Sequence, residues 1–256
     1  MAYFIREVIA GMVKEVEKWK RPTKEARREA KRAAKLNPTS EAQAKVNREN
    51  ALRRLRLDIN ENFKPRDYWL TFTYAREYAP TNESCEQDYK KLMRAIRKEY
   101  KRAGVDMKYI SVCNQPGHRP HIHLLISKGV SLETIQGLWP YGRIDIKLLE
   151  ESGQYRALAE YIFKHYEGKN GGKRWNASKN LTHPQFKERE SGANNWREEP
   201  AAPNGWMLDK VIGIERGINP ITGAEYQKYT LIKIPEVKRS KADIARKKAG
   251  AVVVQL

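Results

Sequence analysis

Two histidines one residue apart are the side chains of this sequence best suited to metal chemistry. His121 and His123 stand in the run from Pro120 to Ile126, in which all the other residues are apolar. Alternate side chains of a β-strand point to opposite faces, so the two imidazoles would share one face while Ile122 would point into a core. Neutral imidazole is the commonest side-chain metal ligand. The pair predicts half of a metal site, and the alternative is two hydrogen-bonded histidines on a half-buried strand.

A tyrosine and a lysine form the second candidate pair. Tyr161 and Lys164 fall in a predicted helix from Gln154 to about Tyr166 and are neighbours on its surface. A phenol is a weak nucleophile at its ordinary pKa of ~10, but a nearby cation favours the phenolate, which can attack a phosphate. The alternative is a tyrosine at the edge of the core beside a lysine whose stem covers apolar surface.

A segment of alternating aromatic and β-branched residues precedes both pairs. It runs from Tyr68 to Tyr74 and carries the strongest strand pattern in the chain. Tyr68 and Leu70 would face one side, whereas Trp69 and Thr71 would face the other. Alone, this pattern predicts only a strand.

In this order, the three segments resemble the motifs of rolling-circle replication initiators of the HUH endonuclease superfamily. Tyr68–Tyr74 resembles the first motif, Pro120–His123 the metal-binding motif and Tyr161–Lys164 the nucleophile motif. The similarity covers about residues 45–190 and extends to single-domain initiators of bacterial plasmids, phages and integrative elements. Their flanking segments are also similar, and here they are Ala51–Phe63, Ser178–Leu181 and Pro184.

The resemblance implies an enzyme that nicks and rejoins single-stranded or hairpin origin DNA. Tyr161 would form a 5′-phosphotyrosine link, and Lys164 would stabilise charge near the phosphate. His121 and His123 would hold a divalent cation. Two histidines with an oxygen ligand favour Mn²⁺, although the abundance of Mg²⁺ in cells favours Mg²⁺. A host DNA polymerase would extend the free 3′-hydroxyl, and a host helicase is a further expected partner because the sequence has no Walker-type loop.

The third metal ligand is where the sequence departs from that pattern. Relatives often carry a glutamate at the end of the preceding strand, and the matching position holds Asn114, with Gln115 next. Either amide oxygen could bind a metal, but without charge, so a lower metal affinity is expected. His118 is a further candidate ligand, and its alternative is an ordinary loop histidine.

A single tyrosine is expected to act. Some relatives use two tyrosines four residues apart, but the fourth residue after Tyr161 is His165. Tyr166 would lie ~140° around the helix from Tyr161, and Tyr155 would also face away.

The charge of the chain indicates a polyanionic partner. The sequence has 50 Lys and Arg against 31 Asp and Glu, a net charge of +19, which is typical of nucleic-acid binding. The candidate DNA contacts lie on a predicted basic helix and in a loop that mixes cations with an aromatic ring. They are Arg53, Arg54, Arg56, Lys173, Arg174 and Trp175. The alternatives are a solvated helical arm for the first three and an anchored loop for the others.

Three regions are expected. Residues 1–66 would form a basic helical N-terminal arm, with helices at Lys18–Lys35 and Ala42–Leu57. Residues 67–168 would form the endonuclease core in the order strand, helix, strand, strand, helix, strand, helix. This order predicts an α+β fold, an RRM-like antiparallel sheet with helices on one face and the metal on the open face. Residues 169–256 would add a loop, strands joined near residues 219–223, and a basic tail, packing on or extending the core.

Composition also bears on the compartment. Cys85 and Cys113 are the only cysteines, so a disulfide framework is excluded. No apolar run approaches the ~20 residues that span a membrane. A bacterial cytoplasmic protein with no membrane partner is expected.

Three other functions fit part of this pattern. A relaxase or a single-tyrosine transposase would use the same chemistry. A non-catalytic RRM-like module that binds nucleic acid would explain the charge and the aromatic strands, but not the co-occurrence of the histidine and tyrosine pairs. A metal-dependent hydrolase without a covalent step would form no protein–DNA adduct.

Overall fold

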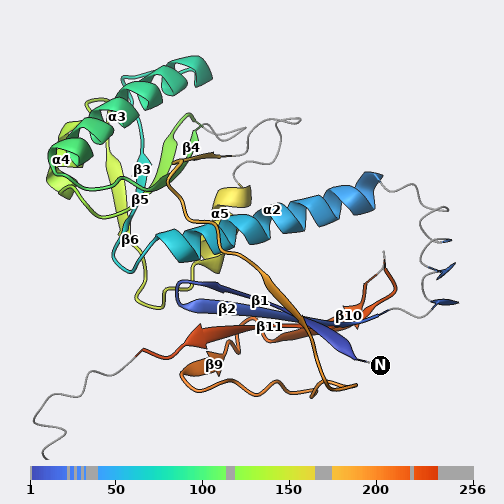
Figure 1. Ribbon diagram of the computed structural model, residues 1–256. Helices are drawn as coiled ribbons and strands as arrows, with labels where there is room; N and C mark the ends of the chain where they lie inside the picture. The colour runs from blue at the N-terminus through green and yellow to red at the C-terminus, as the bar shows by residue number, and fades with distance from the viewer. Residues whose placement is uncertain are drawn as a thin grey trace, which may run out of the picture.

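The protein has two antiparallel sheets with a long helix, α2 (Ser40–Asn62), between them (Figure 1). The computed structural model describes residues 2–21, 24–25, 28–29, 32, 40–113, 119–164, 175–219 and 222–235. The five-stranded sheet has the order β6-β3-β5-β4-β7. The six-stranded sheet has the order β10-β11-β2-β1-β8, and β9 also pairs with β11. The predicted α+β class with antiparallel sheets is confirmed.

The five-stranded sheet and its helices follow the predicted order of elements. Its central strand β5 pairs antiparallel with both β3 and β4. The elements are β3 (Tyr68–Phe72), α3 (Asn82–Arg102), β4 (Tyr109–Cys113), β5 (Ile122–Ile126), α4 (Leu132–Gly137), β6 (Ile144–Leu148), α5 (Arg156–Lys164) and β7 (Asn176–Ala177).

Helices cover both faces of this sheet, whereas the sequence predicted helices on one face only. Leu70 and Leu124 pack with α3 and α4 in one cluster, as the alternation predicted. Trp69 and Leu125, on the opposite face, pack with α2 and α5 in a second cluster. The reason is that Leu125 is also fully buried, so the face that carries the histidines is itself partly a core.

Helix α2 is longer than predicted because both of its sides are buried. Leu55, Ile59 and Phe63 follow at four-residue spacing and face the five-stranded sheet. Leu57 faces the other way, where it packs against Val8 and Ala10 of the six-stranded sheet.

The prediction of a helical N-terminal arm is wrong for residues 3–20. These residues form the hairpin β1 (Tyr3–Ala10) and β2 (Val13–Lys20). Alternating burial along β1, with Tyr3, Ile5, Val8 and Ala10 buried, fits a strand packed on both faces. Of the predicted helix Lys18–Lys35, residues 18–20 belong to β2, while the described residues 24–25, 28–29 and 32 are helical.

Strands from the C-terminal region complete the second sheet. They are β8 (Lys187–Glu190), β9 (Trp206–Leu208), β10 (Ile214–Ile218) and β11 (Glu225–Lys233). The predicted pairing of two strands across residues 219–223 is confirmed by β10 and β11. β11 pairs with β2 along most of its length, so the N-terminal hairpin lies inside the sheet.

The hairpin turn at Gly11 provides a test of how the two sheets are joined. Gly11 has a φ of +56°, and a Cβ there would lie 2.1 Å from the backbone oxygen of Asn60 in α2. We expect Gly11→Ala to lower the free energy of unfolding by about 3 kcal/mol, because backbone strain adds to a clash with backbone. Gly104 has a φ of +67° and nothing within 4 Å of an added Cβ. Gly104→Ala should therefore cost only about 1 kcal/mol. Urea unfolding measures both, and equal losses would contradict the close approach at Gly11.

Two further predictions concern the compartment. Cys85 and Cys113 are free cysteines whose sulfur atoms lie 3.5 Å apart. No helix in the described part of the chain combines the length and apolarity needed to cross a membrane.

Candidate active site

The two predicted histidines lie on one face and point their outer nitrogens at each other. The Nε2 atoms of His121 and His123 are 3.0 Å apart, and the rings are nearly perpendicular with centroids 4.6 Å apart. His123 lies within β5, and His121 immediately precedes it. The strand alternation predicted from the sequence is confirmed.

The backbone fixes which nitrogen of His121 carries the proton. Its Nδ1 lies 2.8 Å from the carbonyl oxygen of Arg119. A carbonyl can only accept a hydrogen bond, so Nδ1 donates and Nε2 keeps its lone pair in the neutral ring. Arg119 is itself held, because its Nη2 donates to the carbonyl oxygens of Ala75 at 2.6 Å and Tyr78 at 2.5 Å.

His123 is held by two residues of the neighbouring strand. Its Nδ1 is 3.0 Å from the hydroxyl of Thr71, which stands directly opposite it in the β3–β5 ladder. The indole of Trp69 stacks on its ring with centroids 5.2 Å apart. Only 5% of His123 is exposed. Such partners fix the orientation of a ligating imidazole.

Sequence reasoning missed the supporting roles of Thr71, Trp69 and Arg119. It had placed Trp69 and Thr71 on one face of β3, but it did not pair that strand with the histidine strand. The usable signal was the alternation itself, since an antiparallel ladder brings residues of one face directly opposite one another.

Tyr161 stands at the rim of this cluster. Its hydroxyl lies 3.3 Å from Nε2 of His123, and its ring meets the edges of both His123 and Trp69. The ring is 40% exposed, so a substrate can reach the oxygen. On the same helix, Ile162 and Phe163 are buried in the core and hold α5 in place.

The pKa of Tyr161 departs from the sequence prediction. Loss of solvent around the ring raises the pKa of Tyr161 above its ordinary value, whereas Lys164 was expected to favour the phenolate. Lys164 is exposed at the last residue of α5 and forms no ion pair with the described residues. Its charge is therefore available to an incoming anion, but it does not activate the phenol.

Other tyrosines were predicted to face away from the site. Tyr155 is buried in the core, and its hydroxyl donates to the carbonyl oxygen of Glu150 at 3.3 Å, so its predicted distance from the site is confirmed. His165 and Tyr166 lie outside the described residues.

The two Nε2 atoms suit a shared metal ion. Imidazole nitrogens bound at ~2.1 Å in neighbouring positions of an octahedron would lie ~3.0 Å apart, which agrees with their separation of 3.0 Å. Within the described ranges, no group of three His, Cys, Asp or Glu side chains could hold a metal. The three predicted candidates for a further ligand lie outside those ranges, and they are Asn114, Gln115 and His118.

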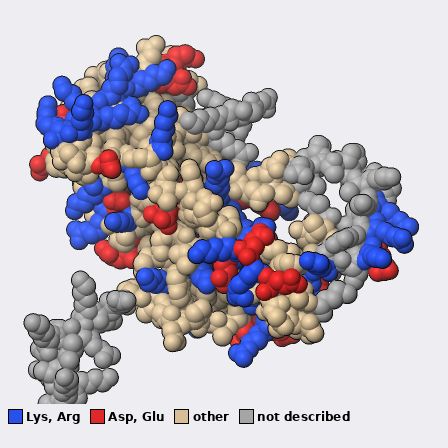
Figure 2. All heavy atoms as spheres, in the orientation of Figure 1, with Lys and Arg blue, Asp and Glu red and all other residues tan. Residues whose placement is uncertain are grey.

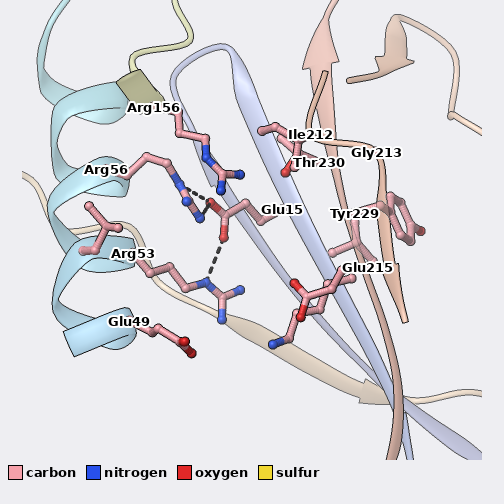
Figure 3. Close-up of a pocket in the computed structure, with 13 residues that line it drawn as sticks. Glu15, Glu49, Arg53, Arg56, Arg156, Ile212, Gly213, Glu215, Tyr229 and Thr230 are labelled. Carbon is pink, nitrogen blue, oxygen red and sulfur yellow. Dashed lines mark hydrogen bonds and ion pairs between the residues drawn. The ribbon is translucent and has the colours of Figure 1, made fainter. Parts of the chain in front are cut away.

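Two of the predicted DNA-contacting arginines point inward instead. Arg53 Nε donates to one carboxylate oxygen of Glu15 at 2.8 Å, and Arg56 Nε donates to the other at 2.9 Å (Figure 3). Glu15 is only 5% exposed. The cluster borders a cavity of about 450 Å³ between α2 and the six-stranded sheet, into which Arg156 also points. Arg53 and Arg56 thus join α2 to β2, because a buried carboxylate requires cationic partners.

The remaining predicted DNA contacts have different positions. Arg54 is exposed on α2 and stays a candidate. Trp175 is half-buried and packs against Phe163 with ring centroids 6.3 Å apart, so part of its ring serves the core. Lys173 and Arg174 lie outside the described residues.

Glu15 gives a stability prediction. We expect Glu15→Gln to lower the free energy of unfolding by about 3 kcal/mol, because it removes the charge that neutralises two partly buried guanidinium groups. Arg54→Gln, on the exposed side of the same helix, should change it by less than about 0.5 kcal/mol. Urea unfolding followed by circular dichroism measures both. If Glu15→Gln were as stable as the parent, the proposed joint between α2 and β2 would be wrong.

Comparison with known proteins bears on the segment that carries this site. No curated protein and no solved structure matches the chain. Residues 67–166 match the family model of the replication-associated protein ORF2. The matched segment runs from just before β3 to just beyond α5, so it contains Thr71, His121, His123 and Tyr161. The match supports a role as a replication initiator and fits an initiator of the rolling-circle type.

Proposed function

We propose that this protein initiates rolling-circle replication by nicking and rejoining single-stranded or hairpin origin DNA through a 5′-phosphotyrosine intermediate. The observation that carries the proposal is the hydroxyl of Tyr161, which lies 3.3 Å from the histidine pair within the segment that matches a replication protein family. A reachable phenol beside two preorganised imidazoles suits nucleophilic attack on a phosphodiester better than it suits binding alone.

The histidines supply the metal-binding half of the site. Nε2 of His121 and Nε2 of His123 would hold a divalent cation, Mn²⁺ or Mg²⁺, which when bound polarises a phosphate and offsets the charge that develops on it. Thr71 and the carbonyl of Arg119 hold the two Nδ1 positions, so both rings can present Nε2 without turning.

Tyr161 supplies the attacking atom. Its oxygen forms a bond to phosphorus, the bond from phosphorus to the 3′-oxygen breaks, and that oxygen takes up a proton to become a 3′-hydroxyl. In the joining step the 3′-hydroxyl attacks the phosphotyrosine and Tyr161 regains its proton. The energy of the phosphodiester stays in the covalent link, so rejoining requires no ATP. Because burial raises the pKa of Tyr161, the proton must leave during the attack.

Lys164 and the ring contacts position the reactants. Lys164 follows Tyr161 by three residues on α5, so its ammonium can approach the oxygens of a phosphate at the Tyr161 hydroxyl. Trp69 meets the edge of the Tyr161 ring with centroids 5.9 Å apart, which restricts the directions in which the phenol points. A host polymerase would extend the released 3′-hydroxyl, with a host helicase separating the strands.

The decisive experiment looks for the covalent link. The full chain is incubated with Mn²⁺ and a fluorescent library of single strands with a randomised window, so that the origin sequence need not be known. We expect a protein–DNA adduct that resists denaturation and that, after nuclease digestion, leaves a nucleotide on Tyr161 by mass spectrometry. Cleavage without an adduct would instead indicate a hydrolase, and binding without cleavage would indicate a non-catalytic module. A relaxase or transposase would also form the adduct, and only the replicon in which the cleaved sequence lies would separate these from an initiator.

A further inference from the structure

Helix α3 carries a concentrated row of positive side chains on its exposed side. We call this row the α3 ridge, and its members are Lys90, Lys91, Arg94, Arg97, Lys98, Lys101 and Arg102. All seven are exposed and fall within roughly 140° of the helix circumference. Figure 2 shows Lys and Arg side chains gathered over the position of α3. Between Lys90 and Arg102 the only acidic residue is Glu99.

Most of this charge is not neutralised within the described part of the protein. Lys91 pairs with Asp88 and Arg102 with Glu99. Arg97 donates to the hydroxyl of Tyr109 at 2.9 Å. The other four cations of the ridge have no ion pair with any described residue, and they are Lys90, Arg94, Lys98 and Lys101. Like charges at three- and four-residue spacing repel one another on a helix, so a polyanion on this surface would relieve a strain that the free protein carries.

The surroundings of the ridge favour duplex DNA over other polyanionic partners. Proteins that bind single strands stack bases on aromatic rings, but Tyr100, the only aromatic residue from Lys90 to Arg102, is buried. A helix that lies on a membrane needs an exposed apolar face, yet Leu92 and Ile96 of α3 are buried against the sheet. From Lys90 to Lys101 the ridge extends ~17 Å along a rigid helix, which suits a regular phosphate backbone.

We propose that the α3 ridge binds the phosphate backbone of duplex DNA that flanks the strand cleaved at Tyr161. The choice of this DNA as the partner rests on the proposed function. α3 packs on the face of the five-stranded sheet that carries Leu70, whereas Tyr161 and His123 lie at the face that carries Trp69. The ridge and the phenol therefore contact different parts of the DNA. The ridge contributes affinity and orientation, and it takes no part in the chemistry.

The test compares two full-length variants that lose the same charge. The ridge variant carries Lys90→Gln, Arg94→Gln, Lys98→Gln and Lys101→Gln, which keep side-chain length and helix propensity. The control variant changes four exposed cations scattered elsewhere that form no ion pair with described residues, namely Lys179→Gln, Lys187→Gln, Lys210→Gln and Lys233→Gln. Fluorescence anisotropy measures binding to a duplex of about two turns and to a poly-dT strand at several salt concentrations.

We expect the ridge variant to lose at least about tenfold in duplex affinity, and its salt slope to fall by about 3, since each lost phosphate contact removes ~0.9. Its binding to poly-dT and its adduct yield on single strands should stay within about twofold of the parent. The control variant should change the duplex slope by less than about 1. Equal losses in the two variants, or a loss confined to poly-dT, would overturn the proposal. So would a ridge variant that keeps duplex affinity but no longer binds phosphatidylserine vesicles.

Failure of this proposal and failure of the proposed function are separable. If the parent protein formed no adduct with any single strand but the ridge variant still lost duplex binding selectively, the proposed nicking would fall and the duplex surface would stand. If adducts formed normally while duplex binding ignored the ridge, the surface assignment alone would fall.

Discussion

Tyr161→Phe should abolish both DNA cleavage and the covalent adduct, with a fall in rate of about 10⁴-fold or more. The substitution removes the phenolic oxygen and leaves the ring, so the edge contacts with Trp69 and His123 persist. The free energy of unfolding should change by less than about 1 kcal/mol. Mn²⁺ binding and duplex binding should also be retained, because neither requires the hydroxyl. Single-turnover cleavage and denaturing gels measure the outcome.

Tyr155→Phe is the matched control for this prediction. It removes a hydroxyl from the same region of the chain, but that hydroxyl lies in the core and bonds to the carbonyl of Glu150. We expect a loss of about 1 kcal/mol in stability and normal cleavage. An active Tyr161→Phe protein would show that another tyrosine or water attacks the phosphate, and the central assignment would then be wrong.

His121→Ala and His123→Ala should each remove detectable Mn²⁺ binding and stop cleavage, while duplex binding persists. Each variant deletes one of two nitrogens that lie 3.0 Å apart and face the same point. DNA affinity should survive because it comes mainly from Lys and Arg contacts with phosphates. Electron paramagnetic resonance of Mn²⁺ gives the metal affinity directly, without reference to activity.

The two histidine variants should differ in stability, and this difference separates metal binding from packing. His123 is buried and stacked on Trp69, so its truncation leaves a cavity and should cost about 2 kcal/mol. His121 is only half-buried, and its truncation should cost much less. Thr71→Val provides a milder variant, because it removes the hydroxyl partner of His123 Nδ1. We expect it to weaken Mn²⁺ binding by ~10–100-fold. Metal-independent nicking by either histidine variant would remove the metal-site hypothesis.

The sequence by itself determined the parts of this protein that depend on local pattern. Alternation placed His121 and His123 on one face of a strand and Trp69 with Thr71 on one face of another, and the structure confirms both. The order of elements from β3 to α5 was predicted correctly for the same reason, since strand and helix periods are read within a few residues of each position.

Only the tertiary structure decided what lies opposite each of these faces. Residues 3–20 become two strands because they pair with β8 and β11, whose paired residues are at least 180 positions away along the chain. Glu15 turns Arg53 and Arg56 inward although it lies 38 and 41 residues from them. Thr71 reaches His123 across 52 residues. A cation on a helix has the same local pattern whether its partner is a buried carboxylate, water or DNA. Burial and long-range pairing therefore separate the inward arginines of α2 from the unpaired cations of the α3 ridge, because the free energy of a charge depends on its surroundings rather than on its neighbours in sequence.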